Sequence, residues 1–158
     1  MGADGSTSFG GNSKALSSSF DRSRFHEIRA QASAILIGGQ TARTEPYQST
    51  PVPLLIISKS GEIPDLVRAN PMALIWNLDP ITALAKAKED FGGNILIEAG
   101  AKLLKEYLLA NLIDELYLTI SQKSGGESVY DLNSLTRNFI IESSEKVGTD
   151  TFLKLVRN

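Results

Sequence analysis

The chain has 158 residues, of which 42% are hydrophobic and 22% charged, a size and composition typical of one globular domain. Its net charge of −2 gives no reason to expect a nucleic-acid-binding domain, which is usually clearly basic, and no apolar run approaches the roughly 20 residues that span a membrane. With no cysteine and one histidine, His26, we expect no disulfide, no metal site and no Ser–His–Asp hydrolase. These absences, and a polar start unlike a signal peptide, favour a cytoplasmic protein with neither nucleic-acid nor membrane partners.

The first 18 residues are rich in Gly and Ser and predict a loop. Ser18 or Ser19 then begins a helix that extends to about Gln31. Short apolar runs next predict three strands that are buried on both faces. These runs cover residues 34–37, 53–57 and 72–76.

Asp79 followed by Pro80 predicts the start of a second long helix, which ends at Gly92. Alternating strands and helices follow, and the chain closes with an antiparallel pair. The predicted elements are a strand at 94–97, a helix at 101–111 and strands at 116–121, 139–142 and 151–156. This order predicts one α/β domain over residues 1–158, a three-layer αβα sandwich with a mainly parallel central sheet and an antiparallel C-terminal edge.

Two turns could bind a phosphorylated nucleotide. Gly38 and Gly39 follow one predicted strand and lead to Thr41, while Glu98 and Gly100 end another and open a helix. In α/β sheets, glycine at this position lets the backbone approach a phosphate, which the N–H groups of the helix start then bind. Neither turn is a P-loop or a G-x-G-x-x-G fingerprint, so tight turns without a ligand remain the alternative.

Charged and polar residues beside these turns also have two interpretations each. Glu98 ends an apolar strand, where its carboxylate needs either a structural arginine or the N–H donors of a substrate ring. Arg29 could hold a substrate phosphate or form a surface salt bridge. Ser58, Lys59 and Ser60 follow a strand and either bind the 2′-phosphate of NADPH or form a polar turn.

Several segments resemble, in order, the reductase domain of the bifunctional riboflavin-biosynthesis deaminase/reductase family, which has a dihydrofolate-reductase-like fold. Residues 3–5 and 12–14 look like its S-x-D-G and D/E-S-x stretches, and residues 25–30 like its helix ending in L-R-A. Residues 34–46 are similar to A-I-L-V-G-x-x-T…D-P, residues 97–101 to E-G-G, and residues 112–116 to L-V-D-E-L.

The resemblance implies NADPH-dependent reduction of a ribosylaminopyrimidine phosphate, 5-amino-6-(5-phosphoribosylamino)uracil, by a homodimer whose interface we expect near residues 112–120. It makes Glu98 and Asp4 the candidate catalytic residues, and Ser13, Arg29 and Glu98 the candidate substrate ligands. The candidate cofactor ligands are Gly38, Gly39, Thr41, Glu45, Ser58, Lys59, Gly100, Ala101, Leu103 and Leu104.

The chain departs from the family pattern at its start. The family opens with an apolar strand before S-x-D-G, whereas only three residues precede Asp4, so this first core strand is expected to be missing. Ser6 stands where the family often has lysine, and E-G-G has become Glu98-Ala99-Gly100. Two alternatives therefore stand beside the pyrimidine reductase: a catalytically impaired nucleotide-binding module of the same fold, and an NADPH-dependent reductase with another substrate.

Overall fold

A computed structural model describes residues 1–11 and 13–158, with every side chain of these except that of Ala101. The chain forms two compact units, one of Met1–Arg24 with Ala110–Asn158 and one of Phe25–Leu109. Helix α1 (Ser19–Ala30) contributes its first half to one unit and its second half to the other. Within the described part of the chain, no helix has the length and apolar character needed to cross a membrane.

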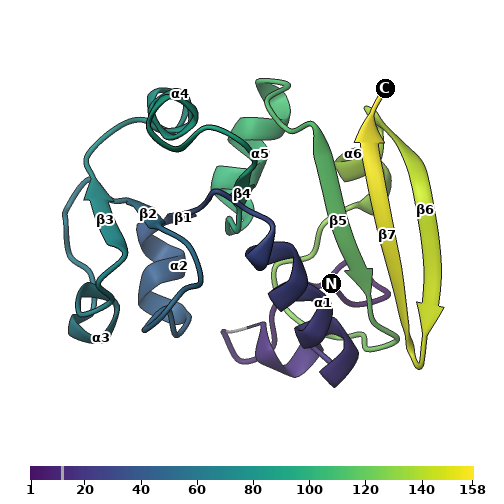
Figure 1. Ribbon diagram of the computed structural model, residues 1–158. Helices are drawn as coiled ribbons and strands as arrows, with labels where there is room; N and C mark the ends of the chain where they lie inside the picture. Colours follow the sequence, from purple (N-terminus) through teal and green to yellow (C-terminus); the bar gives the residue numbers. More distant parts are fainter. Residues whose placement is uncertain (12) are drawn as a thin grey trace. The chain divides into compact units, whose positions relative to one another are not determined.

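The Phe25–Leu109 unit contains a parallel sheet with the strand order β3-β2-β1-β4 (Figure 1). From β1 the chain moves outward through β2 and β3, then crosses back to place β4 on the other side of β1. The strands are β1 (Ala34–Gly38), β2 (Leu54–Ile57), β3 (Ala73–Trp76) and β4 (Ile95–Ile97). This reversal creates a topological switch point between β1 and β4, the place where open α/β sheets bind ligands.

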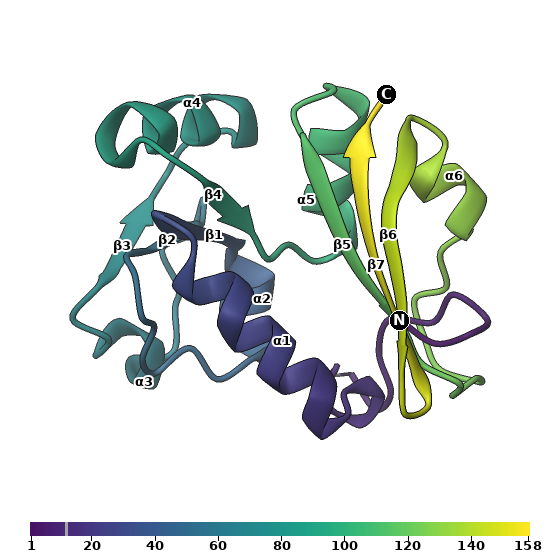
Figure 2. The same ribbon diagram turned by 45° about the vertical axis from the view of Figure 1, so that its right-hand side comes forward.

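The central strands are apolar throughout because helices cover both faces of the sheet. Residues 34–37 of β1 and 54–56 of β2 have no exposed surface. Helix α4 (Pro80–Phe91) lies on one side of these strands and α2 (Gly39–Thr44) on the other (Figure 2). The prediction of buried strands is therefore confirmed for β1 and β2 but wrong for β3, which lies at the edge of the sheet and leaves Leu74 43% exposed.

Helix α4 begins and ends at the predicted signals. The Asp79 side chain accepts a hydrogen bond of 3.0 Å from the Thr82 N–H, and Pro80 occupies the first helical position. Gly92, with φ of +60°, ends the helix. Helix α5 (Ala101–Leu109) is held to this helix by Tyr107, whose buried hydroxyl donates to the carbonyl of Pro80 at 2.9 Å. The short helix α3 (Asp65–Arg68) follows β2.

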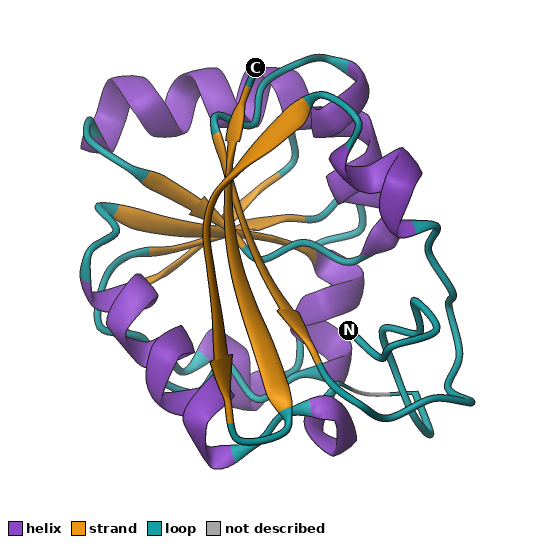
Figure 3. Ribbon diagram, turned by 90° about the vertical axis from the view of Figure 1, so that its right-hand side faces the viewer, coloured by secondary structure: helices purple, strands orange, loops and turns teal. Residues whose placement is uncertain are grey.

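The other unit is built on an antiparallel sheet in which β7 (Asp150–Arg157) lies between β5 (Glu115–Ile120) and β6 (Phe139–Val147) (Figures 1 and 3). A tight turn that contains Gly148 joins β6 to β7, as the sequence predicts. This unit also holds the 3-10 helix η1 (Lys14–Leu16) and α6 (Leu132–Thr136), neither of which the sequence predicted.

The first residues pair with the end of β5. Gly2 forms a parallel bridge with Ser121, and the Ala3 N–H donates to the Lys123 carbonyl at 2.8 Å. The predicted α/β class is confirmed, with a parallel sheet flanked by helices and antiparallel C-terminal strands. Hydrogen bonding nevertheless places the antiparallel strands in a sheet of their own, because β4 pairs only with β1 among the described residues. The element order predicts strand directions, but the partner of each edge strand depends on long-range contacts.

Candidate functional site

The two strand–Gly–helix turns meet at one edge of the parallel sheet. Strands β1 and β4 are neighbours in parallel register, so their carboxyl ends lie side by side. The turn at Gly38 leads into α2 and the turn at Gly100 leads into α5. The Gly100 N–H donates to the Thr41 hydroxyl at 3.3 Å, across 59 residues of chain. Two segments that looked alike in the sequence therefore form one continuous surface at the switch point.

Gly39 allows a close approach of the backbone to the end of β2. A Cβ atom added there would lie 3.0 Å from Oγ and 3.1 Å from Cβ of Ser58, closer than nearly all real contacts. A Cβ atom added at Gly38 would make an ordinary 3.5 Å contact with Leu103. The chain thus brings Ser58 and Leu103 to the same turn, and Gly39 has no room for a side chain of its own because Ser58 and Arg43 lie against it.

The other candidate cofactor ligands lie around this edge. Glu45 is the C-terminal cap of α2, and its N–H donates to the Thr41 carbonyl at 3.0 Å. Lys59 is exposed in the turn after β2, and Leu104 is half-buried in α5. The side chain of Ala101 lies outside the described part of the chain.

Glu98 is bound by an arginine and a tyrosine. Arg29 donates through Nε to Oε1 at 2.7 Å and through Nη2 to Oε2 at 2.6 Å, across 69 residues of chain. The Tyr47 hydroxyl donates to Oε2 at 2.6 Å. The Arg29 and Glu98 side chains are only 14% and 6% exposed. Of the two interpretations of Glu98, the structural arginine is therefore present, and it is the same Arg29 that was expected to hold a phosphate.

Aromatic rings contact the Arg29 guanidinium, and burial shifts the pKa values of Arg29 and Tyr47. The Arg29 guanidinium lies 4.3 Å from the ring centre of Phe25 and 5.1 Å from that of Tyr47. Burial acts to lower the pKa of Arg29, but hydrogen bonds and charge from Glu98 raise it above its ordinary value. Burial, with the adjacent Glu98 carboxylate, also raises the pKa of Tyr47. Both groups therefore stay protonated at neutral pH, as donors to Glu98.

Two candidate residues belong to the other unit, where Asp4 has a local role. One oxygen of its carboxylate accepts from the backbone N–H and the hydroxyl of Ser6, at 3.1 and 2.6 Å. The other oxygen accepts from the Gly125 N–H at 2.6 Å. These hydrogen bonds, the one from Gly125 foremost, lower the pKa of Asp4 to about 2. Ser13 is exposed at the start of η1. Asn12, part of the same quoted motif, lies outside the described residues.

Sequence reasoning missed three residues of the Phe25–Leu109 unit. Tyr47 completes the partners of Glu98, and Asn70 anchors the backbone of Tyr47 with a 3.2 Å hydrogen bond. Arg43, on α2, donates to the Glu62 carbonyl at 3.1 Å in the loop after β2. The only signal for Tyr47 was its place directly after Glu45-Pro46, and no local pattern pointed to Asn70 or Arg43.

A family model described as the RibD C-terminal domain matches residues 1–153. The chain belongs to this family. No curated protein sequence gives a significant match to the chain.

Solved structures of RibD and related proteins share the fold. RibD of Acinetobacter baumannii is 20% identical with a TM-score of 0.77, and the match covers 99% of this chain and 56% of that one. A Thermotoga maritima protein named as a diaminohydroxyphosphoribosylaminopyrimidine deaminase/5-amino-6-(5-phosphoribosylamino)uracil reductase is 19% identical with a TM-score of 0.71, covering 99% and 54%. A pyrimidine reductase-like protein of Corynebacterium diphtheriae is 17% identical with a TM-score of 0.78, covering 100% and 89%. This RibD C-terminal domain thus spans just over half the length of the first two.

Proposed function

We propose that this RibD C-terminal domain is an NADPH-dependent reductase of 5-amino-6-(5-phosphoribosylamino)uracil, in which residues 1–158 form one reductase domain. The observation that carries the proposal is the meeting of the Gly38–Gly39 and Gly100 turns at the switch point between β1 and β4. Open α/β sheets bind nucleotides at this point, with glycine allowing the backbone to approach the phosphates. Gly39 packs directly against Ser58, so this turn and the end of β2 would face a phosphorylated cofactor together.

The cofactor would contact both turns and the end of β2. The backbone of Gly38, Gly39 and Thr41 would face its ribose and phosphates, and the N–H groups at the start of α5 would bind phosphate oxygens. Glu45, Leu103 and Leu104 would complete this surface together with the backbone of Ala101. When bound, NADPH supplies the hydride, and the protein supplies orientation and charge.

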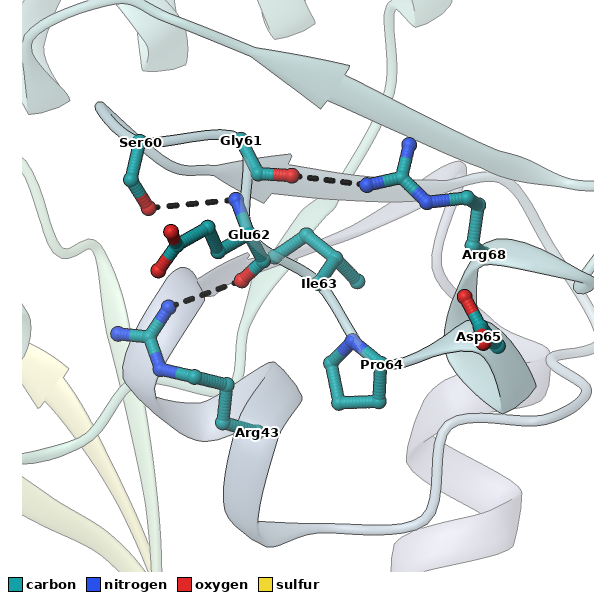
Figure 4. A pocket seen from close by; sticks show the side chains of 8 residues that line it. All are labelled: Arg43, Ser60, Gly61, Glu62, Ile63, Pro64, Asp65 and Arg68. Atoms are coloured by element: carbon teal, nitrogen blue, oxygen red, sulfur yellow. Dashed lines mark hydrogen bonds between the residues drawn. The ribbon is translucent and has the colours of Figure 1, made fainter.

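A pocket of about 450 Å³, lined by the loop after β2, supports NADPH rather than NADH as the cofactor. Arg43 and Arg68 line it from two helices, and each donates to a backbone carbonyl of the 61–62 loop (Figure 4). Their remaining N–H groups, with the Ser60 hydroxyl, would bind a 2′-phosphate, and Lys59 would add charge at the rim. The carboxylates of Glu62 and Asp65 also line the pocket, so the two arginines are needed to make it attractive to an anion.

The substrate would meet the cluster of Glu98 and Arg29. Glu98 would accept an N–H of the pyrimidine ring, and Arg29 would attract the phosphate with the N–H groups that Glu98 does not use. Asp4 and Ser13, which belong to the other unit, stay in this proposal as candidate residues only because the family resemblance implies them. Two further parts of this proposal are a homodimer through residues 112–120, which size-exclusion chromatography tests, and a cytoplasmic location.

A nucleotide-binding module without catalysis is the second candidate. It is favoured by the partners of the two candidate catalytic residues: Arg29 and Tyr47 bind Glu98, while Ser6 and Gly125 bind Asp4. In this alternative both carboxylates serve the fold alone, and the cofactor is bound but never oxidised.

Titration of NADPH and NADH, followed by nucleotide fluorescence, tests the cofactor. We expect NADPH to bind more tightly, and the Arg43→Ala/Arg68→Ala variant to lose about tenfold or more in NADPH affinity with little change for NADH. Arg22→Ala, an exposed arginine of the other unit, is the matched control. Oxidation of NADPH on addition of the ribosylaminopyrimidine phosphate then separates the reductase from the binding module. Failure to bind NADPH at millimolar concentration would refute both.

A further inference from the structure

The Tyr47 hydroxyl occupies a defined place on the Glu98 carboxylate. A carboxylate offers about four lone-pair positions, two on each oxygen. Arg29 Nε takes one position on Oε1, while Arg29 Nη2 and the Tyr47 hydroxyl take both positions on Oε2. Among the described residues, this leaves one acceptor position, and it lies on Oε1. An N–H donor of a ligand would therefore meet Oε1 and find Oε2 already used.

The position of Tyr47 is itself fixed from two sides. Tyr47 is 5% exposed and belongs to the hydrophobic cluster that also contains Ile35 of β1 and Ile56 of β2. Its carbonyl accepts a 3.2 Å hydrogen bond from the Asn70 side chain, which is 3% exposed and also donates to Thr50. The hydroxyl thus reaches Glu98 from a residue of the α2–β2 loop that is held by burial and by a hydrogen bond to its backbone.

We propose that Tyr47 is a positioning residue, anchored by Asn70, which turns the Glu98 carboxylate so that Oε1 alone receives the substrate ring. The proposal rests on the proposed function, because it assigns Glu98 to the substrate. Arg29 alone could hold the carboxylate in a bidentate pair, but it leaves one position on each oxygen open. The third hydrogen bond closes Oε2 and so selects one orientation of an incoming N–H donor.

The Tyr47→Phe variant tests this role because it removes the hydroxyl and keeps the buried ring. Tyr107→Phe is the matched control: its hydroxyl is also buried in the same unit and donates to a backbone carbonyl. We expect Tyr47→Phe to raise the KM for the ribosylaminopyrimidine phosphate about tenfold, the effect of losing one hydrogen bond to a charged group. We expect kcat to change less than about twofold, because the lost hydrogen bond stabilises the bound substrate and the transition state equally. NADPH affinity should be unchanged in both variants.

A second readout needs no substrate. In ¹H–¹⁵N spectra, the Arg29 Nε–H bound to Glu98 should give a protected resonance in the wild type and in Tyr107→Phe. In Tyr47→Phe this resonance should shift and exchange faster as the carboxylate turns. Should Tyr47→Phe match Tyr107→Phe in both readouts, the positioning role is wrong. Absence of turnover in the wild type would refute the proposed function instead. In that case the Arg29 Nε–H resonance alone decides whether Tyr47 positions the Glu98 carboxylate.

Discussion

Removal of either Arg29 or Glu98 should strongly destabilise the Phe25–Leu109 unit, because the two side chains form a buried ion pair. Both side chains are largely buried and joined by two hydrogen bonds of 2.7 and 2.6 Å. Loss of one member leaves the other as an unpaired buried charge. Arg29→Met and Glu98→Gln should therefore each lower the free energy of unfolding by about 3–5 kcal/mol.

A double-mutant cycle isolates the interaction. The Arg29→Met/Glu98→Gln variant should be more stable than the sum of the single effects predicts, with a coupling free energy above about 1.5 kcal/mol. Unfolding in urea can be followed by circular dichroism and by the fluorescence of Trp76, the only tryptophan, which lies in β3 of the same unit. Because the pair is buried, its coupling should persist in 1 M salt.

Lys86 and Asp90 provide the control cycle. They form an exposed ion pair of 2.9 Å on α4, with side chains 45% and 35% exposed. Their coupling should be about 0.3–0.5 kcal/mol and should fade in high salt. A coupling between Arg29 and Glu98 no larger than this, or one that fades with salt in the same way, would refute the assignment of a buried pair.

Three further predictions each concern a single residue. Burial raises the pKa of Tyr47 in the folded state, so the unfolded chain loses this proton at a lower pH than the folded chain does. The free energy of unfolding should therefore fall as the pH rises above about 10, and it should fall less steeply in Tyr47→Phe. Urea unfolding at a series of pH values measures both slopes. Gly39→Val should strongly weaken NADPH binding, measured by fluorescence, since its side chain would collide with Ser58 and push the turn away from the end of β2; binding at wild-type affinity would contradict the assignment. Gly5→Ala should lower the thermal midpoint more than Gly10→Ala: both positions have positive φ, but only at Gly5 would the Cβ overlap a backbone carbonyl.

Local sequence signals predicted most elements of the parallel sheet. Continuous apolar runs such as residues 34–37 have few alternatives to a strand between two layers of helices, because a half-exposed strand would alternate. Asp79 and Pro80 marked the start of α4 since the cap hydrogen bond and the fixed φ of proline act within one turn. Helix α6 was missed because its five residues carry no apolar period.

The sequence by itself also selected the two glycine turns, because glycine at the end of a buried strand is a local requirement of the backbone. Only the tertiary structure decided that the turns meet, through the hydrogen bond from Gly100 to Thr41. It also decided that the cation and the carboxylate expected to bind substrate, Arg29 and Glu98, bind each other. Such pairings join residues 59 and 69 positions apart. They depend on which strands become neighbours in the sheet, and no local pattern of residues encodes that choice.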